Sequence, residues 1–170
     1  MKRILVAGIG NIFLGDDGFG VEVVRRLAKR ALPAGVEIAD FGIRGMDLAY
    51  ALMDGYDAVI MVDIASRSEA PGTLYLIQVQ SEEGQADIDT HGMDPVKVLN
   101  LARELGAEPI PTYVVACEPQ TVIDGAQTVD VIVELTEPVR QAIDKAVELV
   151  EATILNIIGA DSELEVGQKS

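Results

Sequence analysis

The sequence predicts a single α/β domain in which helices cover both faces of a mostly parallel, five-stranded sheet. Short apolar runs alternate with amphipathic stretches, and 170 residues suffice for one buried core but not for two ordinary domains. The chain is 49% hydrophobic and 24% charged, which is typical of a packed globular protein. We expect the domain to occupy residues 1–158 and a mobile polar tail to occupy residues 159–170.

Five strands are expected where short apolar runs end at turn or polar residues. The first is RILVAG, a continuous apolar run, and the last is TYVVACEP, which Pro119 ends. Continuous apolar runs are typical of strands that are buried on both faces of a parallel sheet. The expected strands comprise residues 3–8, 36–40, 57–63, 73–79 and 112–119.

Four helical stretches are expected between and after these strands. The third has the clearest signals, with Asp94 placed to cap it, Pro95 at its first position and Gly106 beyond its end. Near the end of the chain, Pro138 suits a helix start behind Thr136, so the last helical stretch is expected in two pieces. The expected helices lie within residues 18–32, 46–55, 94–106 and 135–155.

Charge and cysteine content exclude several classes of protein. With 13 Lys and Arg against 28 Asp and Glu, the formal charge is −15, which opposes binding to nucleic acid or anionic membranes. No apolar run reaches the roughly 18 residues that a membrane helix needs. Cys117 is the only cysteine, so an internal disulfide is impossible. Because Gly8 and Gly10 interrupt the apolar start, we interpret it as a buried strand of a cytoplasmic protein.

Polar side chains with possible catalytic or ligand roles follow the expected strands. In sheets of this kind, function collects at the carboxyl ends of the strands. Five residues are expected at or near that edge: Asp17, Asp40, Asp63, His91 and Glu118.

Two nucleotide-related interpretations of the first loop are weak. The stretch GIGNIFLGDDGFG, residues 8–20, begins like a dinucleotide-binding turn, and Asp40 could serve as the acid that ends the second strand. However, Phe13 replaces the third glycine, and Asp16 and Asp17 would repel a pyrophosphate. The G-x-G-N turn also resembles that of peptidyl-tRNA hydrolases, but this chain is strongly acidic and its single histidine comes late.

A metal site explains the same residues better. Aspartates that meet at one edge repel each other by roughly 4 kcal/mol per pair about 4 Å apart at an effective dielectric constant near 20. A bound cation removes that cost. Asp17, Asp63 and His91 offer two carboxylates and one imidazole, a set that suits zinc, nickel or a similar metal and leaves coordination positions open.

Each candidate also has a structural alternative. Asp17 could simply cap the following helix, Asp63 could be a turn residue, and His91 could be a solvated surface residue. Cys117 fits a small buried hydrophobic residue better than a nucleophile and receives no role. Asp16 is expected to be solvated or to shape the turn, and Glu118 to hydrogen-bond neighbouring loops.

Six separated motifs resemble those of the hydrogenase maturation proteases, the endopeptidases that trim the large subunit of nickel-iron hydrogenases. In chain order they are GIGNIFLGDDGFGVEVVRRL, DFGIRGMDL, VIMVDIA, APGTLYLI, HGMDPVKVL and ACEP. The resemblance extends from about Met1 to the last helix and implies a phosphorylase/hydrolase-like, three-layer fold.

The resemblance implies that the chain is an aspartic-type endopeptidase that removes the carboxyl-terminal extension of a nickel-iron hydrogenase large-subunit precursor after nickel insertion. It assigns Asp17, Asp63 and His91 to metal binding and Asp40 to recognition or cleavage. It implies that the enzyme has no permanent cofactor and contacts the nickel of the precursor only transiently. It also implies that zinc or cadmium can occupy the same metal-binding residues in vitro. We expect a monomer.

A carboxylate is expected to act as the general base when the peptide bond is cleaved. Asp40, or Asp17 while it binds no metal, is expected to take a proton from the attacking water. Arg44, in the loop GIRG, is a candidate for choosing among precursors. The alternative function is a non-hydrolytic nickel-binding accessory protein of hydrogenase assembly, which would use the same residues.

Overall fold

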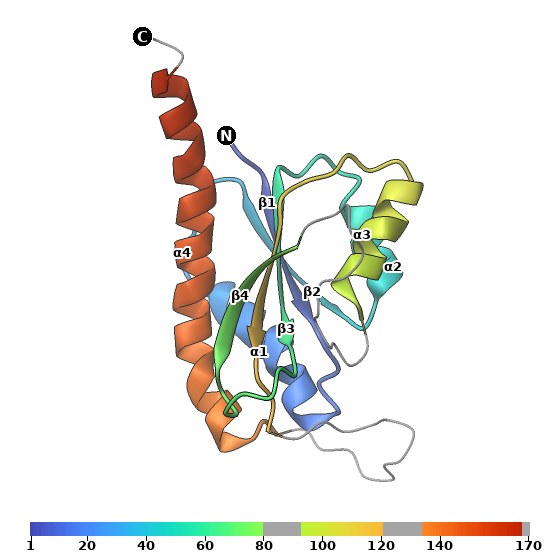
Figure 1. The fold of residues 1–170 in the computed structure, drawn as a ribbon, viewed down its shortest axis with the longest axis vertical. Helices are drawn as coiled ribbons and strands as arrows, with labels where there is room; N and C mark the ends of the chain where they lie inside the picture. The colour runs from blue at the N-terminus through green and yellow to red at the C-terminus, as the bar shows by residue number, and fades with distance from the viewer. Residues whose placement is uncertain (80–92, 121–133, 168–170) are drawn as a thin grey trace.

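The computed structural model of the chain describes residues 1–79, 93–120 and 134–167. Five strands and the helices around them follow one another in the alternating order that the sequence predicts (Figure 1). In chain order the elements are β1 (Ile4–Ile9), the short 3-10 helix η1 (Gly15–Gly18), α1 (Phe19–Leu27), β2 (Val36–Gly42), α2 (Gly45–Ala51), β3 (Ala58–Ile64), β4 (Leu74–Val79), α3 (Pro95–Glu104), β5 (Thr112–Cys117) and α4 (Glu137–Gly167).

The strands form one sheet in the order β2-β1-β3-β5-β4. Four strands are parallel, and only β4, at one edge, runs antiparallel to its neighbour β5. This confirms the prediction of a single α/β domain with a five-stranded, mostly parallel sheet. The carboxyl ends of β1, β2, β3 and β5 therefore meet at the same edge, where the candidate residues were expected.

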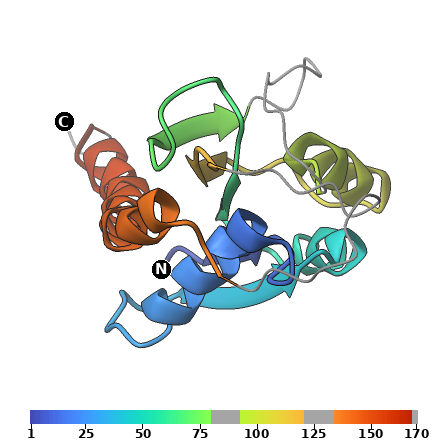
Figure 2. The same ribbon diagram turned by 90° about the horizontal axis from the view of Figure 1, so that it is seen from below.

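The sheet separates two hydrophobic cores, and Figure 2 shows α1 and α4 on one face with α2 and α3 on the other. Successive residues of β1 contribute to opposite cores because side chains alternate along a strand. Ile4 and Val6 pack with the α1 and α4 side, whereas Leu5, Ala7 and Ile9 pack with the α2 and α3 side. All six residues of β1 are buried, which explains its continuous apolar run.

Two helix boundaries differ from the sequence prediction. The helix α1 ends at Leu27 rather than continuing to residue 32, because residues 28–31 are exposed and add no apolar contact to the core. The helix α4 begins at Glu137, behind Thr136, as Pro138 suggested, and continues to Gly167. Any preceding helical piece falls within residues 121–133, outside the described residues, and the mobility of residues 159–170 stays a prediction.

The amino end of α3 is capped as its sequence predicts. The side chain of Asp94 accepts a hydrogen bond at 2.9 Å from the backbone N–H of Val96, and Pro95 occupies the first helical position.

Across the described residues, none of the helices combines the length and the apolar composition that a membrane span requires.

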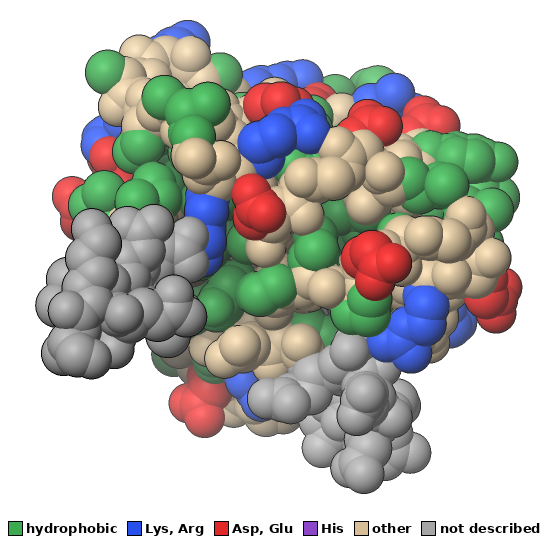
Figure 3. All heavy atoms as spheres, turned by 90° about the horizontal axis from the view of Figure 1, so that it is seen from above, with side chains coloured by type: hydrophobic (Ala, Val, Ile, Leu, Met, Phe, Trp, Pro, Cys, Tyr) green, Lys and Arg blue, Asp and Glu red, His purple; other side chains and the backbone are tan. Residues whose placement is uncertain are grey.

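Charges are paired at the amino ends of the strands. The guanidinium of Arg3 lies 3.2 Å from the Glu37 carboxylate and stacks 4.6 Å from the centre of the Tyr56 ring, and the backbone N–H of Arg3 donates to Asp57 at 2.7 Å. Figure 3, which views this end of the molecule, shows acidic and basic side chains interspersed. Arg3 therefore offsets acidic charge among the described side chains at this end of the sheet.

The close packing of α1 on the sheet depends on Gly20. A Cβ at this position would lie 2.0 Å from the carbonyl oxygen of Val62 and 2.4 Å from that of Ile9. We predict that Gly20→Ala lowers the free energy of unfolding by roughly 1–3 kcal/mol or more, because backbone must move to admit the methyl group.

The matched control is Gly159→Ala, where the new methyl group meets no atom within 4 Å inside α4. Urea denaturation should show this variant to be more stable than the parent by about 0.5–1 kcal/mol, the helix advantage of alanine over glycine. If Gly20→Ala were as stable as the parent, the tight α1–sheet contact would be contradicted.

Candidate active site

The first loop, residues 10–18 between β1 and α1, folds back so that the carboxylate of Asp17 lies close to the beginning of the loop. Asp17 Oδ2 accepts a hydrogen bond at 2.9 Å from the backbone N–H of Asn11, and Oδ1 is buried. Gly10 makes this approach possible, because a Cβ there would lie 1.8 Å from the carbonyl oxygen of Asp17 and its φ is 133°. The glycines of the motif thus let the chain fold back tightly onto an acidic side chain.

Asp63 lies in β3, next to that loop, and is 2% exposed. Burial raises its pKa well above the usual range, a hydrogen bond from the Ile64 N–H lowers it, and the negative charge of Asp17 raises it. The Ile64 N–H donates to Asp63 Oδ1 at 2.8 Å. Asp17 and Asp63 are therefore electrostatic neighbours, and their ionised forms oppose each other.

Asp40 occupies the end of β2, opposite Gly8 of β1. Its Oδ1 accepts from the Gly42 N–H at 2.9 Å, and the carbonyl of Gly42 accepts from the Gly10 N–H at 2.9 Å. A register shift separates this pairing from the next one, Ile9 with Gly42. The backbone hydrogen bond between Gly10 and Gly42 thus joins the first loop, which carries Asp17, to the end of β2, which carries Asp40.

The first loop and the end of β2 with its connection to α2 border an open pocket of about 320 Å³. The lining residues come from the first loop, α1 and the β2–α2 connection: Gly10, Asn11, Ile12, Phe13, Val21, Asp40, Phe41, Gly42, Ile43 and Arg44. Asp40 is exposed on this pocket, and Asn11, whose N–H binds Asp17, forms part of its wall. An extended peptide in the pocket would therefore pass Asp40 and the Asn11 backbone that holds Asp17.

The donor set fits a cation. The structure brings Asp17 and Asp63 together as expected, and a bound metal ion would offset both the burial of Asp63 and the repulsion between the two acids. His91, the third expected ligand, lies outside the described residues. Within residues 1–79, 93–120 and 134–167, no group of three acidic, His or Cys side chains is arranged to hold a metal ion.

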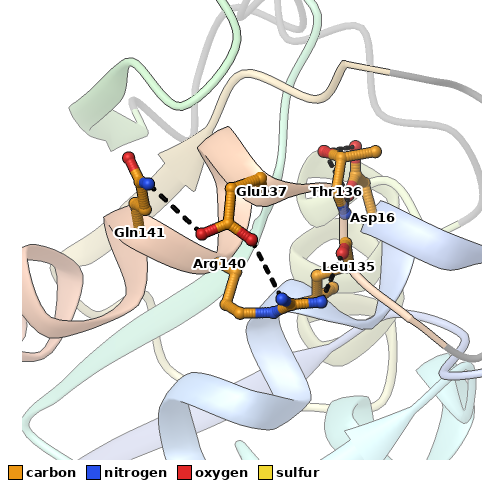
Figure 4. Close-up of polar contacts among 6 residues, drawn as sticks. All are labelled: Asp16, Leu135, Thr136, Glu137, Arg140 and Gln141. Atoms are coloured by element: carbon orange, nitrogen blue, oxygen red, sulfur yellow. Dashed lines mark hydrogen bonds and ion pairs between the residues drawn. The ribbon is translucent and has the colours of Figure 1, made fainter.

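Asp16 has a role that the sequence analysis missed. It is fully buried, and its carboxylate accepts a hydrogen bond from the backbone N–H of Gln120 at 2.9 Å. It also accepts a hydrogen bond from the backbone N–H of Thr136 at 2.7 Å (Figure 4). The hydroxyl of Thr136 lies 2.8 and 2.9 Å from the two oxygens. The expectation of a solvated side chain is wrong, because Asp16 joins the first loop to the end of β5 and the start of α4.

Glu118 organises a second loop, as the sequence suggested. It is 3% exposed and accepts hydrogen bonds from the backbone N–H groups of Arg67, at 2.9 Å, and Glu69, at 2.7 Å. The Tyr75 hydroxyl donates to it at 3.2 Å. Glu118 therefore fixes the connection between β3 and β4, and every one of these contacts is structural.

Cys117 is completely buried in the α1 and α4 core. Burial, together with the negative charges of Asp16 and Glu118, raises the pKa of its thiol to about 12. A thiol with this pKa stays protonated near neutral pH and is a poor nucleophile. The structure thus agrees with the interpretation of Cys117 as a small apolar residue.

Together these features define a three-layer α/β protein whose acidic site and pocket share the carboxyl edge of the parallel strands. The chain belongs to the hydrogenase maturation proteases, since the model of that family matches residues 21–153. It is accordingly a hydrolase, an endopeptidase that acts in hydrogenase maturation.

Individual relatives support the assignment. A protein of Methanocaldococcus jannaschii named for the same family is 34% identical over 155 residues, which cover 88% of this chain and 94% of that protein. The hydrogenase 2 maturation protease of Escherichia coli is 33% identical, with 89% and 90% covered. The solved structure of the hydrogenase maturating endopeptidase HybD from E. coli aligns with a TM-score of 0.74 at 31% identity, covering 91% of this chain and 93% of that one.

The burial of Asp63 predicts a trade between stability and metal binding. Asp63→Asn keeps the oxygen that accepts from Ile64 but removes a charge that is costly to bury. We expect a higher thermal midpoint for the metal-free variant at pH 7 and weaker zinc binding in calorimetric titration. The exposed control Asp54→Asn should change neither quantity, and a lower midpoint for Asp63→Asn would contradict the account of a disfavoured buried charge.

The contacts of Asp16 predict a loss of stability without a chemical role. Asp16→Ala leaves the Gln120 and Thr136 N–H groups without this acceptor, so the free energy of unfolding should fall by about 3 kcal/mol. Thr136→Val removes only the hydroxyl contacts and should cost about 1 kcal/mol. Urea denaturation measures both, and a change below about 0.5 kcal/mol for Asp16→Ala would show that the loop is held by other contacts.

Proposed function

We propose that this endopeptidase removes the carboxyl-terminal extension of a nickel-iron hydrogenase large-subunit precursor, and that it uses the nickel already inserted in that substrate for recognition. One observation carries the proposal: Asp17, which is coupled to Asp63, is held by Asn11 in the wall of a pocket that presents a third carboxylate, Asp40. The solved relative from E. coli is a hydrogenase maturating endopeptidase, which favours hydrolysis over a purely nickel-binding accessory role.

Substrate recognition is assigned to Asp17, Asp63 and His91. Carboxylate oxygens and an imidazole suit a divalent transition metal and leave positions for the ligands that the precursor provides. The substrate's nickel would offset the repulsion between Asp17 and Asp63, so a loaded precursor would be bound more tightly than an empty one. No resident cofactor is needed, and zinc or cadmium would occupy the same residues in vitro.

The proposed general base is Asp40, which makes the enzyme an aspartic-type peptidase. The Gly42 N–H holds Oδ1, and no hydrogen bond from a described residue reaches the other oxygen, which can take the proton from the attacking water. Asp40 then gives this proton to the amine of the departing extension as the C–N bond breaks. The nickel contact fixes where the precursor lies, so the scissile carbonyl reaches that water only in the loaded substrate. Asp17, held by Asn11, is the alternative base.

Arg44 is proposed to choose among precursors. Its guanidinium donates to the backbone carbonyls of Asp40, at 2.6 Å, and Phe41, at 3.2 Å, which places a fixed positive charge on the rim of the pocket.

We also propose that the reaction takes place in the cytoplasm. The enzyme is proposed to be a monomer, since the net charge of −15 opposes self-association.

The central test is the intact mass of a large-subunit precursor, nickel-loaded and nickel-free, after incubation with this protein. We expect loss of a carboxyl-terminal peptide only from the loaded precursor and only with the unmodified enzyme. Asp40→Asn should reduce the cleavage rate by about 100-fold or more, the usual contribution of a general base, while zinc binding persists. His91→Ala should lose both zinc binding and cleavage.

Two results would contradict the proposal. Normal cleavage by Asp40→Asn would remove Asp40 from the mechanism. An unchanged precursor mass in every sample, with a precursor that a second protease still cuts, would transfer the function to nickel binding without hydrolysis.

A further inference from the structure

Exposed apolar side chains gather beside the pocket. Among the described residues, five large ones lie in the first loop, in the β2–α2 connection, on α2 and just after it, with exposed fractions between 44% and 67%. The remaining exposed large apolar residues, Met1, Leu76 and Leu155, belong to the chain terminus, to β4 and to α4. We call the five residues the apolar stripe; they are Phe13, Ile43, Met46, Tyr50 and Met53.

The stripe gives α2 a second apolar face. Leu48, Ala49 and Leu52 are buried in the core between α2 and the sheet. Met46 and Tyr50 are spaced four residues apart on the other side, so their side chains lie in a row along α2, and Met53 lies two residues beyond the end of the helix. A helix that packs on one side only needs one apolar face, so the second face indicates a contact with another molecule.

The stripe continues the candidate active site. Phe13 and Ile43 line the pocket that contains Asp40, and Ile43 precedes Met46 by three residues. A protein substrate whose extension entered the pocket would therefore meet the stripe directly outside it.

We propose that the apolar stripe docks the folded body of the large-subunit precursor, through an apolar patch with basic side chains at its rim. This inference rests on the proposed function. A pocket of about 320 Å³ holds only a few side chains, whereas a specific protein interface buries about 800 Å² on each partner. Surface outside the pocket must supply the difference, and tyrosine and methionine are residues that interfaces favour.

The charges around the stripe specify the chemistry of the partner. Asp47 and Asp54 are exposed on and just after α2, and Asp40 is exposed at the pocket. Arg44 offsets part of this negative charge, since its guanidinium lies 3.4 Å from the Asp47 carboxylate. This acidic rim, together with a net charge of −15, attracts a partner with basic residues around its apolar patch. The same charges repel a second copy of this chain, so a self-association surface is the less favoured occupant.

The test compares Met46→Glu and Tyr50→Glu with the matched control Leu155→Glu, which alters an exposed apolar residue of α4 away from the pocket. All three are made in the Asp40→Asn background, so that the nickel-loaded precursor is bound but not consumed, and its Kd is measured by biolayer interferometry. Each stripe variant should raise the Kd about tenfold or more, whereas the control should leave it unchanged. Unchanged thermal midpoints confirm that the variants fold, and Tyr50→Ser, which adds no charge, should weaken binding in the same direction.

An equal Kd for the stripe variants and the control would overturn the proposal. So would a wild-type dimer in sedimentation velocity that Tyr50→Glu converts to a monomer, because the stripe would then join two copies. The proposed function is judged separately, by cleavage with the wild-type enzyme. If the stripe variants weaken binding but the wild-type enzyme does not cleave the precursor, the docking surface is supported and hydrolysis is rejected. If the wild-type enzyme cleaves the precursor but the stripe variants bind it normally, hydrolysis is supported and the docking surface is rejected.

Discussion

The repulsion between two acids at the carboxyl ends of the strands is the constraint on which the site depends. Asp63 is buried in a strand of the sheet, and Asp17 is brought beside it by a loop that only glycine at position 10 allows. A fold without a task for these charges would gain stability by neutralising one of them. Retaining both is reasonable if a cation approaches from outside, and a metal carried by a substrate meets that condition.

Three buried acids near this edge, Asp16, Asp63 and Glu118, serve different purposes because their hydrogen-bond partners differ. Asp16 accepts from backbone groups after β5 and before α4, and Glu118 accepts from the loop after β3. Asp63 accepts from the next residue in its own strand. The first two fix loops, whereas the third adds a negative charge beside Asp17. Of the adjacent acids, Asp16 thus supports the loop, whereas recognition is the role that we propose for Asp17.

The sequence predicted the sheet, the cap of α3 and the placement of Asp17, Asp40 and Asp63 at one edge, because these depend on local patterns and on the geometry of parallel strands. It could not reveal the role of Asp16, whose partners Gln120 and Thr136 are more than a hundred residues away in the chain. The early end of α1 and the apolar stripe on α2 depend on which faces find a packing partner, which helical spacing alone does not show. The place of His91 lies outside the described residues and stays a prediction.

The most direct test of the account is X-ray absorption spectroscopy at the nickel edge on the nickel-loaded precursor, alone and in complex with the Asp40→Asn enzyme. The account predicts additional oxygen or nitrogen neighbours around nickel in the complex, and fewer of them when Asp63→Asn is introduced as well. A nickel environment that is the same in the free precursor and in both complexes would contradict recognition of the metal by these acids.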